Sequence, residues 1–397
     1  MVTQIRTFRV PTNVLAALLL GAAATSVGAQ GATKEKIPAR PKLAPAQDTN
    51  FAMAYYQYGL EKIRRQPTVA ADAFYWATRL APQWAEPYYA RRVALILSEG
   101  ARAIDYLVGS PSVVKTRKFH VIDSLQYKAL ARNPFLIQSL DRLLIEEVVY
   151  GIGGGEGLFH YGRSRGDLLH NAWAAYTSGK YAKAAEYFGV AIKRYPTATW
   201  LHASRAGAFA AQLKYDSAIT ELSVMLDKRR KEEDKEIVHF YDSKAMIEYS
   251  IGVAHSLTGN DQAAREAYER ALTEDLAFYT AHAALGDLAV QREDTAQALS
   301  EYKIAVELKQ DDAALRFGYA LALLKASREH EGAMQFAKAI EIEPYFAHPH
   351  YYLGRLYDTA DIPDEAMLHY AAFVAKAPTV MEERAWVVTR MTELGKK

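Results

Sequence analysis

The chain has 397 residues, no cysteine and a formal net charge of +2. Without cysteine it has no disulfide, no thiolate metal ligand and no cysteine nucleophile, and its small net charge gives no general reason to expect nucleic acid as a ligand. The many alanine and tyrosine residues and the few β-branched runs favour an all-α protein packed through small residues.

Residues 1–29 have the pattern of a secretory signal peptide. Arg6 and Arg9 precede an apolar run over 14–24, and small residues then fit cleavage after Ala29. The run is shorter than the ~20 apolar residues of a spanning helix, so we expect cleavage and a periplasmic or secreted protein; an uncleaved anchor is the alternative. No later segment is long and apolar enough to span a bilayer, which predicts no stable membrane insertion after cleavage.

Residues 30–50 are rich in lysine, alanine, glutamine and proline. Pro38, Pro41 and Pro45 interrupt any helix before it can form. This composition predicts an extended tether between the signal and the first helix.

The region 51–150 is predicted to be an N-terminal helical block. Helices are expected over 51–65 and 87–98, and the stretch between them has small, aromatic and proline residues at a spacing that returns later in the chain, at Ala70, Phe74, Ala77 and Pro82. The basic stretch 115–120 is interpreted as a solvated loop, with a contact to an anionic surface as the alternative.

A helical pattern then continues to Ala131, is broken at Asn133-Pro134, and resumes as an amphipathic helix over 135–150. The glycine-rich segment 151–166 follows and predicts a flexible joint between two helical blocks. It lacks the Gly-Lys-Ser/Thr ending of a phosphate-binding loop. Asp167 is expected to cap the next helix.

From residue 167 the chain is dominated by one repeating pattern. Residues 167–236 hold two units of it, residues 237–380 hold four regular units of 34 residues, and residues 381–397 read as a polar-faced capping helix. Twelve extra residues before the regular units are expected in a loop or in a longer helix.

In the four regular units a small residue is followed sixteen positions later by an aromatic one. The small residues are Gly252, Gly286, Ala320 and Gly354, and the aromatic residues are Tyr268, Tyr302, Phe336 and Tyr370.

This period and these columns resemble the tetratricopeptide repeat. The resemblance implies a right-handed superhelical solenoid of antiparallel helix pairs, in which the small residue admits the aromatic ring of the second helix. It also implies a non-enzymatic scaffold that binds a partner protein or peptide in a concave groove lined by the first helices.

Seven residues project onto that groove if the resemblance holds: Trp173, Tyr176, Trp200, Tyr249, Phe317, Tyr351 and Arg355. The groove is therefore expected to be aromatic, although several of these rings would alternatively be core between repeats. The places that carry the lysine and asparagine of a carboxylate clamp in chaperone-binding relatives hold other residues here, which argues against such a clamp: Leu169, Ala203, Tyr249, Ala283, Phe317 and Tyr351.

No catalytic, cofactor or metal site is predicted. His330-Glu331 is not followed by the second histidine of a zinc protease, and His348 and His350 have no carboxylate companion at ligand spacing. The predicted function is an adaptor of the cell envelope. The alternatives are a scaffold of a polysaccharide-export or outer-membrane assembly apparatus, whose aromatic residues would stack on sugars, and an enzyme with an unrecognised site.

Overall fold

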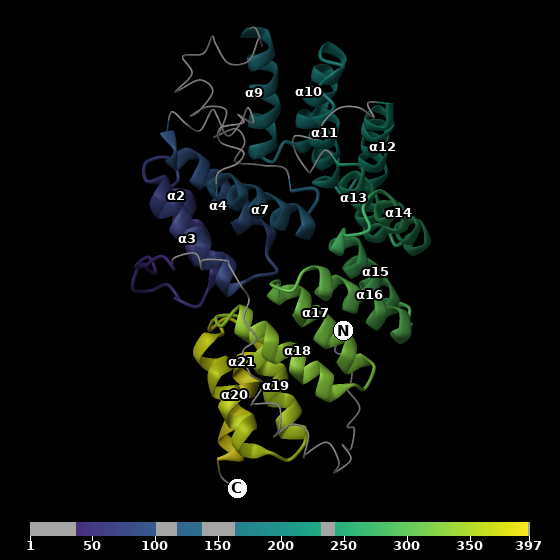
Figure 1. The fold of residues 1–397 in the computed structure, drawn as a ribbon. Helices are drawn as coiled ribbons and strands as arrows, with labels where there is room; N and C mark the ends of the chain where they lie inside the picture. Colours follow the sequence, from purple (N-terminus) through teal and green to yellow (C-terminus); the bar gives the residue numbers. More distant parts are fainter. Residues whose placement is uncertain (1–36, 101–116, 137–162, 232–242, 396–397) are drawn as a thin grey trace. The chain divides into compact units, whose positions relative to one another are not determined.

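The structure, a computed structural model, describes residues 37–100, 117–136, 163–231 and 243–395. Within these ranges every regular element is an α-helix (Figure 1), so the all-α prediction is confirmed. None of these helices combines the length and the apolar character needed to cross a bilayer.

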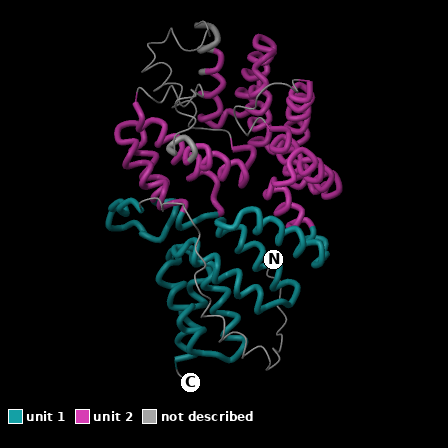
Figure 2. Tube along the Cα trace, in the orientation of Figure 1, with its two compact units in different colours: residues 1–54, 79–82, 289–397 teal, residues 55–78, 83–288 magenta. Residues whose placement is uncertain are grey.

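The chain divides into two compact units (Figure 2). Unit 1 comprises residues 1–54, 79–82 and 289–397, and unit 2 comprises residues 55–78 and 83–288. Each unit is described by itself below.

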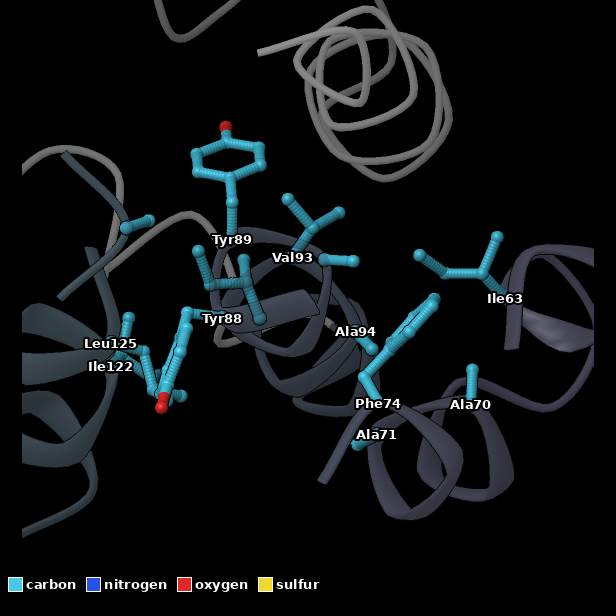
Figure 3. Packing of buried hydrophobic residues seen from close by; sticks show 13 residues of the cluster. Ile63, Ala70, Ala71, Phe74, Tyr88, Tyr89, Val93, Ala94, Ile122 and Leu125 are labelled. Carbon is cyan, nitrogen blue, oxygen red and sulfur yellow. The ribbon is translucent and has the colours of Figure 1, made fainter. Parts of the chain in front are cut away.

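The N-terminal block has four described helices: α2 (Ala52–Lys62), α3 (Pro67–Leu80), α4 (Ala85–Ser98) and α7 (Arg117–Arg132). In unit 2 their apolar side chains form one core, in which Phe74 of α3 packs with Val93 of α4 and α7 adds Ile122 and Leu125 (Figure 3). The two helices predicted before residue 100 are thus confirmed, with ends that differ by a few residues.

Three local predictions in the first half are wrong where the structure describes them. Residues 117–120 belong to the first turn of α7, so they are not a loop. The next helix, α9, begins at Arg163, so residues 163–166 are helical and Asp167 lies inside a helix instead of capping it. The remainder of the glycine-rich joint and most of the helix expected over 135–150 lie outside the described residues.

Six helix pairs follow, and within each unit successive helices pack against one another. Their bounds are α9 (Arg163–Thr177), α10 (Tyr181–Arg194), α11 (Trp200–Ala210), α12 (Tyr215–Lys231), α13 (Lys244–Leu257), α14 (Asp261–Glu274), α15 (Tyr279–Gln291), α16 (Thr295–Leu308), α17 (Ala313–Lys325), α18 (Glu329–Ile342), α19 (His348–Thr359) and α20 (Pro363–Lys376). Part of the twelve-residue excess lengthens α12, which has 17 residues where α10 and α14 have 14. The final helix is α21 (Glu382–Leu394).

The turn inside every pair uses the same backbone conformation. One residue per turn has a positive φ, between 57° and 75°, and the six are Gly179, Leu213, Gly259, Glu293, Ser327 and Asp361. The next residue then donates its N–H to a carbonyl five residues back, as Lys214 does to Phe209 and Arg328 does to Leu323. These bonds satisfy carbonyls that the end of a helix leaves open.

The small and aromatic columns have the predicted role. Tyr268 and Tyr370 are buried, and a Cβ atom added at Gly252 or Gly354 would lie 2.4 Å or 2.5 Å from their rings. Only glycine admits the ring at this distance, so the column residue sets how closely the two helices of a pair approach.

Residues 37–50 contain no helix, as the prolines predict, but they are not a free tether. Within unit 1 the Asp48 carboxylate accepts hydrogen bonds from the Thr379 backbone N–H (2.6 Å) and hydroxyl (2.9 Å). The Asn50 side chain donates to the Ala375 carbonyl at 2.8 Å. This N-terminal strap, residues 37–50, is therefore held on the last repeat.

The C-terminal helix α21 packs on the last pair as expected, but its outer face differs from the prediction. Val387 and Leu394 are buried against that pair, but Trp386 is 46% exposed and Val388 is also exposed. The outer face is therefore not uniformly polar, which corrects the sequence-based expectation.

Candidate partner-binding faces

The seven predicted groove residues are divided between the two units. Trp173, Tyr176, Trp200 and Tyr249 lie in unit 2, and Phe317, Tyr351 and Arg355 lie in unit 1. Trp173 and Tyr249 are buried, and the other five are half-buried.

Three of the predicted groove residues belong to one apolar cluster of α9, α10 and α11: Trp173, Tyr176 and Trp200. Trp173 is 3% exposed and meets Phe188 edge-on, with ring centroids 5.1 Å apart. Tyr176 lies against Tyr181 at 5.0 Å, and burial raises its pKa to about 12. Trp173 is thus part of the repeat core, which is the alternative that the sequence left open.

Tyr249 is covered by another part of its own chain. Its ring lies 5.6 Å from Phe278 and 5.7 Å from Tyr268, and 7% of it is exposed. Its hydroxyl donates a buried hydrogen bond of 2.8 Å to the carbonyl of Ala131 in α7. Burial raises the pKa of this hydroxyl.

Phe317 lies inside an aromatic cluster of unit 1. Its ring centroid is 5.2 Å from Phe346, 5.6 Å from Phe336 and 5.6 Å from Tyr352. These rings come from α17, α18, α19 and the turn before α19. Phe317 therefore contributes mainly to packing between neighbouring pairs.

Tyr351 and Arg355 combine with Trp386 into an accessible surface, which we call the Trp386 face. The Arg355 guanidinium carbon lies 5.8 Å from the Tyr351 ring and 5.7 Å from the Trp386 ring, both cation–π distances. The Tyr351 and Trp386 rings meet edge-on at 6.1 Å. Two helices of unit 1, α19 and α21, position these side chains.

Arg355 differs from the arginines of α21 in its partners. Arg390 binds both carboxylate oxygens of Asp358 at 2.8 Å, and Arg384 donates to the carbonyls of Val374 and Ala377. Among the described residues Arg355 has no carboxylate partner, and its guanidinium donates only a long bond of 3.4 Å to the Tyr351 hydroxyl. Its charge is therefore available to an additional ligand.

Trp386 was not among the predicted site residues because residues 381–397 resemble a polar cap in sequence. The signal was present in Ala385-Trp386-Val387-Val388, where apolar residues are consecutive. On a helix, consecutive residues point to different sides, so only some of them can face the preceding repeat.

Comparison with known families identifies the repeat pattern. The tetratricopeptide repeat family profile matches residues 169–233 and 283–345. The chain carries tetratricopeptide repeats.

Solved structures that are similar to this chain at low identity include two that are described as tetratricopeptide repeat proteins. A repeat protein from Cytophaga hutchinsonii is 16% identical, with 52% of this chain and 78% of that chain covered and a TM-score of 0.43. YrrB, described as a repeat protein with an unusual peptide-binding site, is 20% identical, with coverage of 53% and 100% and a TM-score of 0.39. The Cut9–Hcn1 complex is 15% identical, with 86% of this chain and 76% of that chain covered and a TM-score of 0.44.

No curated protein sequence matches the chain.

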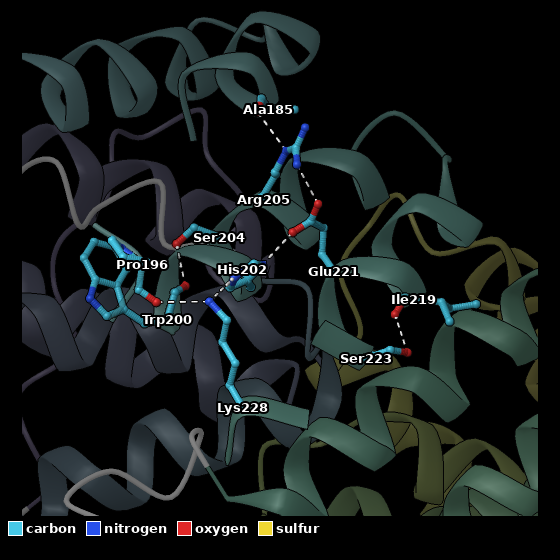
Figure 4. A network of polar contacts seen from close by, with 10 residues as sticks. All are labelled: Ala185, Pro196, Trp200, His202, Ser204, Arg205, Ile219, Glu221, Ser223 and Lys228. Atoms are coloured by element: carbon cyan, nitrogen blue, oxygen red, sulfur yellow. Dashed lines mark hydrogen bonds and ion pairs between the residues drawn. The ribbon is translucent and has the colours of Figure 1, made fainter. Parts of the chain in front are cut away.

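Two of the tetratricopeptide repeats contain buried polar networks at equivalent positions. In the first, His202 contacts Glu221 through Nδ1 at 2.7 Å and Lys228 through Nε2 at 3.3 Å, and Arg205 also binds Glu221 (Figure 4). Burial alone would raise the Glu221 pKa, but the bonds and charges of His202 and Arg205 outweigh it and lower the pKa.

The second network has the same spacing along the chain. His350 Nδ1 lies 3.1 Å from His369 Nδ1, and Lys376 Nζ lies 3.0 Å from His350 Nε2. Sequence reasoning missed this pairing because the two histidines are on successive helices.

Both ring nitrogens of His202 and of His350 are engaged, so neither imidazole has a nitrogen available as a general base in this arrangement. In the described part of the chain no group of three or more histidine or acidic residues could hold a metal ion. Each network links the two successive helices of its repeat.

Proposed function

We propose that this protein is a non-enzymatic interaction scaffold of the cell envelope, exported by its N-terminal signal, which binds a partner protein or peptide on the Trp386 face. The observation that carries the proposal is the exposed Trp386 ring beside Arg355, whose charge has no carboxylate partner among the described residues. Tryptophan, tyrosine and arginine are the residues that most often dominate binding energy at protein interfaces.

The Trp386 face adjoins the repeat core but is more exposed than the core: the Trp386 ring meets the buried Tyr370 edge-on at 5.9 Å, and 46% of Trp386 is exposed. The column aromatics Tyr268, Phe336 and Tyr370 are buried and hold helix pairs together, so they have little surface to offer a partner. The Trp386 ring is rigid and only partly covered. Such a side chain loses little conformational entropy when it is covered.

A scaffold of a polysaccharide-export or outer-membrane assembly apparatus is the second candidate. The same exposed Trp386 ring supports it, because an aromatic face can also stack on a sugar. The two candidates differ in the partner that the protein should capture from an envelope extract.

The test compares partner capture by the wild-type chain with capture by Trp386→Ala and Arg355→Ala. Leu368→Ala is the matched control, since Leu368 is an exposed apolar residue of the neighbouring helix α20. We expect both test variants to lose the captured protein and the control to retain it, with thermal unfolding measured for each.

Unchanged capture by both test variants would refute the Trp386 face as the binding site. Recovery of a polymer synthase or a porin would favour the export apparatus. Export is tested separately by the intact mass of the protein from the envelope fraction, which should begin at Gln30.

A further inference from the structure

Helix α7 lies outside the helix pairs and has two apolar sides. On one side Ile122, Leu125 and Ala129 pack in the core with Tyr88 and Val93 of α4. Their spacing of three and four residues places them on one stripe of the helix. This side attaches α7 to the N-terminal block.

The other side of α7 contacts the tetratricopeptide repeats of unit 2. The Tyr127 ring lies 5.7 Å from Tyr279 and 6.2 Å from Phe278. Leu130 packs in the same cluster as Met246 and Tyr249. We call the surface of Tyr249, Phe278 and Tyr279 the α13–α15 face.

A hydrogen bond fixes the end of α7 on this face. Ala131 is in the last turn of α7, where backbone carbonyls lack a partner within the helix. The Tyr249 hydroxyl donates to this carbonyl at 2.8 Å, across 118 residues of sequence. The bond therefore recognises the end of a helix and does not depend on a particular side chain at position 131.

The residues after α7 extend the contact. Leu136 packs in the same cluster as Leu130, and Phe135 joins the neighbouring cluster of Leu222, Ile247 and Ile251. Apolar and aromatic side chains thus continue along the repeats past the end of the helix.

We propose that the α13–α15 face is a helix-binding face and that residues 117–136 are its resident ligand within the same chain. The partner class that fits this face is an amphipathic helix with an aromatic residue and, three positions later, a leucine, ending where Tyr249 can reach a carbonyl. Helices commonly bind to partner surfaces through anchors at this spacing. Because the resident helix belongs to the same chain, its binding is intramolecular, so a partner helix must compete with it.

This inference rests on the proposed function in one respect only, that the repeats bind protein segments. The face lies in unit 2 and uses none of the residues of the Trp386 face. Failure of one test therefore leaves the other unaffected.

The experiment measures binding of a fluorescent peptide of residues 117–136 to the full chain. In the test variant Tyr127→Ala and Leu130→Ala weaken the resident helix on the α13–α15 face, whereas Ile122, Leu125 and Ala129 still hold it on α4. We expect this variant to bind the peptide about tenfold or more tightly than the wild type, because competition by the resident helix falls.

Two controls make the result specific. A peptide with the same two alanine substitutions should not bind the variant, and adding Tyr249→Ala to the variant should abolish binding of the unaltered peptide. Circular dichroism and thermal unfolding show whether the variant is folded, and Leu130→Ala alone is the milder substitute if it is not. Equal peptide binding by wild type and folded variant, or equal binding of both peptides, would overturn the proposal.

Discussion

Gly354 stands so close to the Tyr370 ring that any side chain at this position must displace it. The Cβ of an alanine would lie 2.5 Å from the ring, and Tyr370 is fully buried. The absence of a side chain at Gly354 therefore sets the distance between α19 and α20.

We predict that Gly354→Ala lowers the free energy of unfolding by ~1–3 kcal/mol, since overpacking in a rigid core outweighs the helix propensity gained. Gly318→Ala is the matched control, because its Cβ would meet the hydroxyl end of Tyr302 at 3.1 Å. Chemical denaturation of both variants checks the prediction. Equal stability of Gly354→Ala and wild type would show that the column does not set the helix spacing.

Buried histidines make stability depend on pH. Burial first, and then the charge of Lys376, lower the pKa of His350 to about 3 and of His369 to about 4. The unfolded chain, with histidine pKa values near 6.5, binds more protons below that pH than the folded chain does. Stability is therefore lost as the pH falls from about 6.5 towards about 3.

The expected result is a steeper fall in melting temperature over this window for the wild type than for a His350→Gln/His369→Gln variant. Comparison with the variant separates these two histidines from other groups with lowered pKa, such as Glu221 and His255. Parallel melting profiles would contradict the assignment.

At the scale of the helix pair, the turn conformation recurs although its residue changes. Two of the six positive-φ positions are glycine and four are not. A residue with a side chain costs about 1–2 kcal/mol in this conformation. The rest of the folded chain must offset this cost.

Leu213 offers the clearest test of the turn, because it is 75% exposed and buries little surface. We predict that Leu213→Gly raises the free energy of unfolding by up to ~1 kcal/mol, since the gain in backbone conformation exceeds the entropy that glycine loses. The reverse exchange, Gly259→Leu, should destabilise by ~1–2 kcal/mol. Denaturant midpoints of both variants are the measurement, and destabilisation by Leu213→Gly would contradict the argument.

At the scale of the whole molecule, the N-terminal strap links segments that are 331 residues apart in sequence. Burial alone would raise the pKa of Asp48, but hydrogen bonds from Thr379 and Asn50 outweigh it and lower the pKa. The carboxylate is thus stabilised in its charged form on the last repeat.

We predict that Asp48→Ala accelerates trypsin cleavage after the exposed Lys42 and changes the melting temperature little, because the bonds it removes are close to solvent. Asp364→Ala, an exposed acidic residue in the first turn of α20, is the control. Cleavage at the wild-type rate would mean that the strap is held by other contacts.

The helix pairs and the small and aromatic columns can be predicted from the sequence alone. These features depend on residues close in the chain, and each repeat packs mainly on its neighbours, so a local period encodes them. The exposure of the candidate site residues was not encoded in this way. Tyr249 and Tyr351 occupy equivalent positions in their repeats and differ only in what covers them.

Which aromatic surfaces are open depends on contacts between segments that are far apart in the sequence. Helix α7 covers Tyr249 from 118 residues away. Trp386 meets Tyr370 of the last repeat with one side of its ring but stays 46% exposed, because Val387 and Leu394 are the side chains of α21 that are buried there. Neither α7 nor the strap follows the 34-residue period, and contacts between distant segments leave no periodic signal in a single sequence. Whether an aromatic residue lies in the core or on an open face therefore depends on packing between distant segments.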